Sequence, residues 1–321
     1  MKSIKEFLRF NKIAEGLLPS NHNSLNQSFF NAHVFDFYSI SKNGTIVFIK
    51  NKITFKNLTE SQFTALLAAY EFKTGEMAQW DSINPVYVTF DNCFISNRIL
   101  NKLFELKDGS TLYKMRKITE YKFINCNFSK GVLDLSDNDS LPAIENTTIE
   151  GGNVEVLLLP KISNTSSNKR GSLTISNCPK LSQIHNMTKL GATITNCPNL
   201  KEFKNCEVAY SLSLDNVGIR DFNFGNDLIR TPRRDDFSLQ INNCNNLTTV
   251  SMLYFADYKI AIENCNKLQK IDLQLAPPQK SFRPRRELLL SNNPNLEEFN
   301  PKSKSGISKY VQIKNCPKLR N

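Results

Sequence analysis

Cysteine is the residue type in this sequence with the most varied chemistry, and all eight cysteines directly follow an asparagine. Thiolates can act as nucleophiles or as zinc ligands. The spacing favours neither role, because no Cys-x-x-Cys pair occurs and no histidine lies at zinc-site spacing from two cysteines. The Asn-Cys pairs therefore predict a structural column of small buried side chains. An amide can fill the same place, as expected for Asn138 and Asn293.

Arginine and lysine supply the second candidate chemistry, the binding of anions. Basic residues recur just before the predicted strands, and the forked donors of arginine suit carboxylates and phosphates. A solvated charged edge, partly neutralised by Asp235, Asp236 and Glu287, is the alternative interpretation. The candidate partner-binding residues are Lys169, Arg170, Arg230, Arg233, Arg234, Arg283, Arg285, Arg286, Tyr310 and Lys314.

Catalytic motifs do not emerge from the sequence. His22, His33 and His185 are scattered, which is typical of ordinary loop or surface histidines. No phosphate loop, nucleophile elbow or dinucleotide fingerprint occurs, so the sequence predicts no catalytic residue, no metal, no cofactor and no small-molecule substrate. We therefore expect a protein that is not an enzyme.

The elements that must position these residues are short strands in a repeated unit. In Ser172–Ile184, the apolar Leu173 and Ile175 alternate with polar residues, the period of a strand with one buried face. One such unit buries too little apolar surface to fold alone, so copies must stack around a shared core. With Cys178 as marker, the next copies follow at gaps of 19, 20, 27, 21, 28 and 23 residues, at Cys197, Val217, Cys244, Cys265, Asn293 and Cys316.

The unit resembles the leucine-rich repeat family. Its core motif reads Leu-x-Leu-x-x-Asn/Cys, and the matching residues here are Leu173, Ile175, Cys178, Leu181 and Ile184. Cysteine followed by Pro-x-Leu is similar to many plant-type repeats. The resemblance implies a curved stack of parallel strands that serves mainly as a protein-binding scaffold. Val217 replaces the cysteine and Gly218-Ile219 shifts the next apolar position, so the register stays open at 217–222.

Helices are expected in the N-terminal half. The strands around Ile53, Val88 and Tyr121 are 35 and 33 residues apart, which leaves room for a helix in each coil. Thr59–Gln62 forms a capping-box pattern that opens one helix, and Ser96 opens the next. The predicted fold class is an α/β solenoid, with helical returns in the N-terminal half and irregular returns in the C-terminal half.

Two regions follow from these patterns. Residues 1–50 are expected to form a capping region, with an amphipathic helix at 3–18 and a hairpin at 34–38 and 45–49. Residues 51–321 form the repeat solenoid, with a possible seam at 127–170. The register at 126–138 stays open, because Asn138 follows Cys126 by only 12 residues.

Composition narrows the choice of partner and compartment. The formal net charge is +11 and the pI about 9.2, which favours an acidic partner. No run approaches the ~20 apolar residues of a membrane span, and the N-terminus lacks a signal-peptide apolar block. With unpaired cysteines, this predicts a reducing cytoplasm. The Asn- and Lys-rich composition suggests an AT-rich genome, such as that of a bacteriophage or a low-GC bacterium, and a bacteriophage protein would occupy the host cytoplasm.

The expected function is a non-enzymatic scaffold that binds an acidic macromolecular partner, foremost an acidic protein surface, through basic edge loops. Nucleic acid or another polyanion bound by the same arginines is the first alternative. A β-helical carbohydrate-active protein is the second, although it needs carboxylates gathered on adjacent coils. The sheet face predicted to be exposed is small and polar, and it comprises Thr174, Ser176, Thr193, Thr195, Ser211, Ser213, Asp215, Ser238, Gln240 and Asn242.

Overall fold

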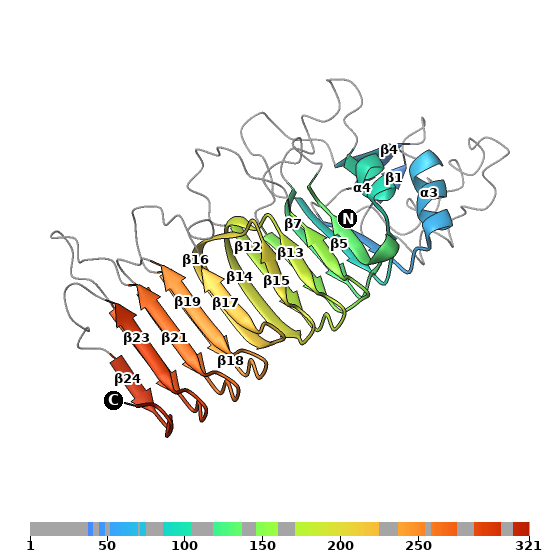
Figure 1. Cartoon of the computed structure of the whole chain (residues 1–321). Coiled ribbons are helices and arrows are strands. Elements are labelled where there is room, and N and C mark those ends of the chain that lie inside the picture. The colour runs from blue at the N-terminus through green and yellow to red at the C-terminus, as the bar shows by residue number, and fades with distance from the viewer. Residues whose placement is uncertain are drawn as a thin grey trace, which may run out of the picture. The chain divides into compact units, whose positions relative to one another are not determined.

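Parallel strands in stacked sheets make up most of the fold, and helices are few (Figure 1). The computed structural model describes residues 38–40, 45–48, 52–69, 71–74, 86–104, 118–136, 146–159, 171–224, 237–253, 258–274, 286–302 and 311–320. The chain divides into two compact units. Unit 1 comprises Met1–Leu133 and Asn138–Gly152, and unit 2 comprises Asp134–Asp137 and Asn153–Asn321.

Unit 1 contains four neighbouring parallel strands: β3 (Lys52–Lys56), β5 (Val86–Asp91), β7 (Ile118–Ile124) and β10 (Asn146–Glu150). The predicted register is confirmed, because Ile53 pairs with Val88 and Val88 with Tyr121. One row of this register is aromatic. The ring of Phe90 stacks on those of Phe55 and Phe123, with centroid distances of 5.6 and 5.1 Å, so the strands share one buried core.

Two helices return the chain in unit 1, as predicted. They are α3 (Glu60–Ala69) and α4 (Asn97–Phe104). The capping box forms at α3, where the Thr59 backbone N–H donates to Gln62 Oε1 at 3.0 Å and the Gln62 N–H donates to Thr59 Oγ1 at 3.4 Å. At α4, the Ile99 N–H donates to Ser96 Oγ at 3.4 Å. Local capping thus fixes where each helix begins.

The remaining elements of unit 1 are short. A hairpin is present as β1 (Tyr38–Ile40) antiparallel to β2 (Thr45–Phe48), so the second predicted strand is confirmed, whereas the first begins later than predicted and shares only Tyr38 with 34–38 among the described residues. β2 also pairs in parallel with β4 (Glu71–Thr74). β6 (Phe94–Ile95) pairs in parallel with β8 (Asn127–Phe128), which precedes the 3-10 turn η2 (Ser129–Gly131) and β9 (Val132–Asp134). The expected helix at 3–18 lies outside the described residues, so the capping role of 1–50 stays a prediction.

Unit 2 has a first sheet of seven parallel strands: β12 (Gly171–Ser176), β14 (Thr188–Cys197), β16 (Glu207–Val217), β18 (Phe237–Asn242), β20 (Tyr258–Glu263), β22 (Arg286–Ser291) and β24 (Val311–Lys314). The register matches the predicted repeat copies. Leu173 pairs with Ala192, Ala192 with Leu212, and so on to Leu288 with Val311. Val217 pairs with Cys197 and therefore takes the marker position expected of it.

The C-terminal returns differ from the irregular segments that the sequence predicts, because a second strand follows each corner. One group of these strands is β11 (Val156–Leu158), β13 (Gln183–His185) and β15 (Glu202–Lys204). The other is β17 (Asp221–Phe224), β19 (Thr249–Leu253), β21 (Lys270–Gln274) and β23 (Glu298–Lys302). Among their described side chains, these strands of three to five residues bury at most two, such as Ile184 or Ile271, and β15 buries none, so their period-two pattern is short.

A tight turn connects the two strands of a coil. The Leu181 N–H donates to the Cys178 carbonyl at 3.2 Å, and the Leu200 N–H donates to the Cys197 carbonyl at 3.1 Å. Proline is the second residue of both turns, where its fixed φ suits a β-turn. Leucine then points back into the core with 0% exposure. The Cys-Pro-x-Leu pattern is therefore a turn that ends on a buried residue.

Candidate functional site

The cysteine column is structural, as the sequence predicts. Cys93 Sγ contacts the Phe55 carbonyl at 3.4 Å and Cys126 Sγ contacts the Phe90 carbonyl at 3.3 Å, so each thiol bonds to the preceding coil. Burial raises the pKa of Cys126 and of Cys265 to about 12. Such thiols stay protonated at neutral pH and are poor nucleophiles. Among the described residues, no group of three His, Cys, Asp or Glu side chains could hold a metal ion.

Asn293 replaces a cysteine in this column, as predicted, and its side chain is fully buried. Its Nδ2 donates to the Ile262 carbonyl at 2.9 Å, and its Oδ1 accepts from the Cys265 N–H at 2.9 Å. The amide therefore joins two coils at a position where a thiol makes weaker contacts.

Cys206 does not belong to the column. It lies at a second corner, between β15 and β16, where its Sγ contacts the Ile184 carbonyl at 3.4 Å. The sequence carries a signal for this, because Cys206 follows Cys197 by only nine residues, less than half a coil. Met187 holds the equivalent place in the preceding coil, directly after Asn186.

The asparagine before each corner has a role that sequence reasoning missed. Asn177, Asn196 and Asn216 have φ values of 55°, 54° and 53°, in the left-handed region that asparagine tolerates better than most residues. Their side chains form a ladder, in which Asn196 Nδ2 donates to Asn177 Oδ1 at 3.0 Å and Asn216 Nδ2 donates to Asn196 Oδ1 at 3.1 Å. All eight asparagines that precede a cysteine have a positive φ, so backbone geometry accounts for the recurring Asn-Cys pair, and pairing between coils adds to it where the ladder forms.

The sheet face predicted to be exposed is confirmed as exposed or half-buried in unit 2. The register places two acidic residues, Asp215 and Glu263, in one row of the first sheet with Asn242 between them. Two strand spacings separate their Cα atoms, roughly 9.6 Å. Both carboxylates already accept hydrogen bonds, from Asn243 Nδ2 at 2.9 Å and from Ser291 Oγ at 2.6 Å respectively.

The predicted partner-binding residues fall mostly outside the described residues. These are Lys169, Arg170, Arg230, Arg233, Arg234, Arg283, Arg285 and Tyr310. Arg286 is the first residue of β22, whereas Lys314 is the last residue of β24 and is exposed. The structure thus places these two residues at opposite ends of parallel strands, and it does not bring them together.

The strand starts of the first sheet form one row in unit 2. Phe237 pairs with Tyr258, and Tyr258 pairs with Arg286. The basic segments 225–236 and 275–285 each run, in sequence, from the end of a second-sheet strand to one of these starts. We call this row the strand-start edge.

A second group of cations lies on the corner turns, and sequence reasoning missed it. All are exposed, and we call them the turn edge: Lys180, Lys201, Arg220, Lys267, Lys318 and Arg320. Among the described residues, their one ion pair is that of Arg220 Nε with Asp221 Oδ2 at 4.0 Å. Exposed Glu297 lies on the same turns. The recurrence of Lys beside the turn leucine, as in Pro-Lys-Leu, was the available signal.

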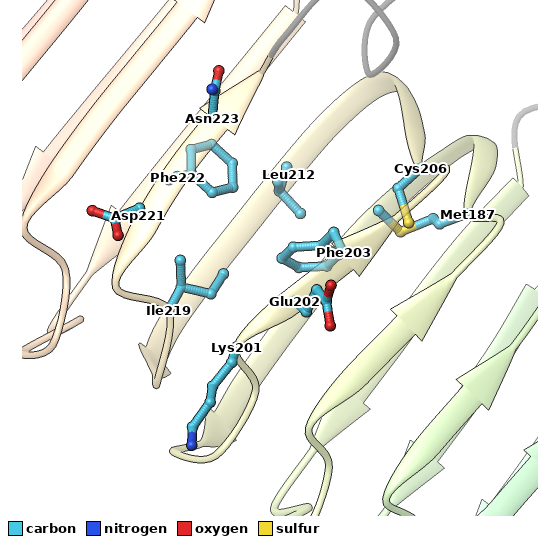
Figure 2. A pocket seen from close by; sticks show the side chains of 10 residues that line it. All are labelled: Met187, Lys201, Glu202, Phe203, Cys206, Leu212, Ile219, Asp221, Phe222 and Asn223. Atoms are coloured by element: carbon cyan, nitrogen blue, oxygen red, sulfur yellow. The ribbon is translucent and has the colours of Figure 1, made fainter.

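A break in the second sheet opens a cavity in unit 2. No strand pairing joins β15 to β17 within the described residues, although β14 and β16 behind them are paired. The cavity has a volume of about 210 Å³. Figure 2 shows its lining, with Phe203 coming from β15, Phe222 from β17 and Leu212 from β16.

No protein-family model matches this sequence, and no curated protein or solved structure matches it either. Within the described part of the chain, no helix is both long and apolar enough to cross a membrane.

Proposed function

We propose that this chain is a non-enzymatic, leucine-rich-repeat-like solenoid that binds an acidic macromolecular partner, foremost an acidic protein surface, through the basic segments at its strand-start edge. The observation that carries the proposal is the register of Phe237, Tyr258 and Arg286. Adjacent parallel strands lie roughly 4.8 Å apart. Residues at the ends of segments 225–236 and 275–285 are therefore anchored within about two strand spacings of each other.

The distribution of charge supports a cationic interface. Carboxylates of the second sheet are already neutralised within the fold, since Lys270 Nζ lies 3.5 Å from Asp272 Oδ2 and 3.3 Å from Glu298 Oε2. Beside the strand-start edge, Lys259 Nζ likewise lies 3.7 Å from Glu287 Oε2. With a net charge of +11, the excess cations are left to meet an outside partner.

The test compares two variants that each lose four positive charges. Arg233, Arg234, Arg285 and Arg286 are changed to Ser in the first, and Lys180, Lys267, Lys318 and Arg320 are changed to Ser in the second. With a labelled polyglutamate peptide as probe, the first variant should bind at least tenfold more weakly than wild type, and the second should change much less. Equal losses would mean that net charge alone drives binding, and the edge assignment would be wrong.

Salt separates the protein partner from nucleic acid, the first alternative. Affinity for a single strand falls with log salt at a slope of roughly −0.7 per phosphate contact. If the four arginines contact phosphates, changing them to Ser should therefore reduce the slope by roughly 3. A steep slope for oligo-dT, together with weak binding of polyglutamate, would favour the nucleic-acid function.

A β-helical carbohydrate-active protein is the second candidate, and the second parallel sheet favours it. Each coil, such as β14 followed by β15, contributes one strand to each of two parallel sheets, which is expected of a β-helix. Asp215 and Glu263 are its carboxylates in one row. Cleavage of any polysaccharide in an activity screen, lost in Asp215→Asn and Glu263→Gln, would establish this function instead.

A further inference from the structure

The second sheet of unit 2 is interrupted at one step of its backbone ladder. Along the row that follows the turns, the Lys201 N–H donates to the Ser182 carbonyl at 3.0 Å, and the Thr248 N–H donates to the Arg220 carbonyl at 2.7 Å. The same contact recurs from Gln269 to Thr248 at 2.9 Å. At the step between these two bonds, no hydrogen bond joins the Arg220 N–H to the Lys201 carbonyl, although the structure describes both residues.

A shortened turn explains the interruption. Three residues separate Cys197 from Lys201, whereas only two separate Val217 from Arg220. Ile219, 2% exposed, replaces the turn leucine, and Gly218 donates its N–H to the Cys197 carbonyl at 3.2 Å. The coil therefore leaves its corner one residue early, and β17 begins out of step with β15.

The resulting cavity is lined mainly by apolar side chains. Met187, Cys206, Leu212 and Ile219 are 1 to 2% exposed, and Phe222 is 5% exposed. Phe203 is half-buried, so the cavity is accessible on its side. Apolar cavities of roughly 150 Å³ accept a benzene ring, and this one, at about 210 Å³, has room for one aromatic side chain.

At the mouth of the cavity, the acidic side chains already have partners, whereas one basic side chain does not pair with a described carboxylate. Asp221 Oδ1 already accepts from Thr248 Oγ1 at 2.8 Å and Thr249 Oγ1 at 2.7 Å. Glu202 is paired with Lys204 at 3.2 Å. Lys201 is exposed and has no ion pair with a described carboxylate, and Figure 2 shows it extending away from the apolar side chains.

We propose that this cavity receives one aromatic side chain of the acidic partner, which its apolar lining holds while the surrounding acidic residues of the partner meet the basic segments. The inference rests on the proposed function. Continuity along the chain supports it, because Asn223 lines the cavity and segment 225–236, with Arg230, Arg233 and Arg234, begins two residues later. A buried aromatic anchor within a polar, charged surround is the usual form of a binding hot spot.

Toluene, the side-chain analogue of phenylalanine, tests the cavity without the partner. Among the described residues, Met187 is the methionine that lines it, so its ¹³C-labelled methyl resonance should shift most on addition of toluene. Leu212→Phe should fill the cavity and abolish the shift. The four-arginine variant should keep it. A Met187 resonance that does not move at saturating toluene, or moves equally in Leu212→Phe, would overturn the inference.

Leu214 provides a control for the filling substitution. It faces the same side of β16 as Leu212 and is 1% exposed, but it does not line the cavity. Leu212→Phe should leave the urea unfolding midpoint unchanged or raise it, whereas Leu214→Phe should lower it by overpacking. A lowered midpoint in both variants would mean that the cavity has no room for a ring.

Two acidic peptides test the occupant. One is Asp-Glu-Asp-Glu-Phe-Glu-Asp-Glu-Asp and the other has Ala in place of Phe. Wild type should bind the Phe peptide about tenfold more tightly, since burying a phenylalanine stabilises a complex by at least this factor. Leu212→Phe should remove the difference, and the four-arginine variant should weaken both peptides. Equal binding of the two peptides would show that no aromatic side chain occupies the cavity, and the proposed function would stand. If neither peptide binds, both the aromatic occupant and the proposed function are wrong.

Discussion

At the scale of single residues, the two residues of the Asn-Cys pair have different roles at the corner of a stacked coil. The asparagine adopts a left-handed backbone that turns the chain, and the cysteine fills the small space inside the corner. The burial of the cysteines was predictable, because small apolar residues at one repeat position must stack. The ladder of asparagine side chains was not, since the recurrence of asparagine before each corner does not show which side chains meet between coils.

Asn196 allows the two contributions of asparagine to be separated. Asn196→Ala should destabilise the protein by about 2 kcal/mol, because alanine tolerates the left-handed region less well than asparagine and two exposed hydrogen bonds are lost. Asn196→Gly loses the same bonds without the backbone strain, so its cost should be smaller by about 1 kcal/mol. Urea unfolding midpoints of the two variants measure the difference.

Asn199→Ala is the matched control for this pair. Asn199 donates to the Pro179 carbonyl at 2.7 Å and is absent from the residues with positive φ. Its loss should cost no more than about 1 kcal/mol. Equal midpoints for Asn196→Ala and Asn196→Gly would contradict a backbone role for the corner asparagine.

At the scale of elements, capping and alternation predict most of the structure. The Thr59 and Ser96 caps and the register of the first sheet were predictable, because these signals are local or repeat with the coil. The second sheet was not predicted from the sequence. Strands such as β13 have only three residues, which is too few for an alternation of apolar and polar residues to be recognised. The interruption at β17 depends on a single absent turn residue, whose effect on pairing shows only in three dimensions.

Gly218 lies in the shortened turn that causes this interruption. An added Cβ would lie 1.9 Å from the Pro198 carbonyl oxygen, a backbone atom that cannot turn aside. Gly218→Ala should therefore destabilise the protein by about 3 kcal/mol. Exposed Arg220→Ala, two residues on, should stay within about 0.5 kcal/mol of wild type. Circular dichroism during urea unfolding measures both, and a neutral Gly218→Ala would show that the turn can relax.

At the scale of the whole molecule, the cysteines were expected to be structural, and five of them, in both units, stay protonated at neutral pH. A hydrogen bond with the Cys178 side chain instead lowers the pKa of Cys197. Burial raises the pKa of Cys93, Cys206 and Cys244 to about 11, and that of Cys126 and Cys265 to about 12. The basic segments were equally visible in the sequence. Which partner they meet could not be predicted, because a repeat scaffold accepts many surface chemistries on one core.

Alkaline pH should weaken the fold through these thiols. Their ordinary pKa is 9.0, so above pH 9 the unfolded chain releases protons that the folded chain retains. The stabilisation is complete below pH 9 and declines as pH rises toward 11. Urea midpoints at pH 8, 9, 10 and 11 should fall, and the double variant Cys244→Ala, Cys265→Ala should start lower but fall less steeply. Parallel slopes would assign the loss to other groups.

The amide ladder also has a direction, and this bears on how the protein ages. From Asn315 to Asn292 and from Asn292 to Asn264, each side chain donates through Nδ2 to the oxygen of the coil before it. Spontaneous deamidation replaces that nitrogen with an oxygen and adds a negative charge, so an aged Asn292 could still accept from Asn315 but could no longer donate to Asn264. Deamidation within the ladder would thus place two oxygen atoms opposite each other, where they repel. Old preparations should therefore lose their hydrogen bonds between the coils where deamidation has occurred.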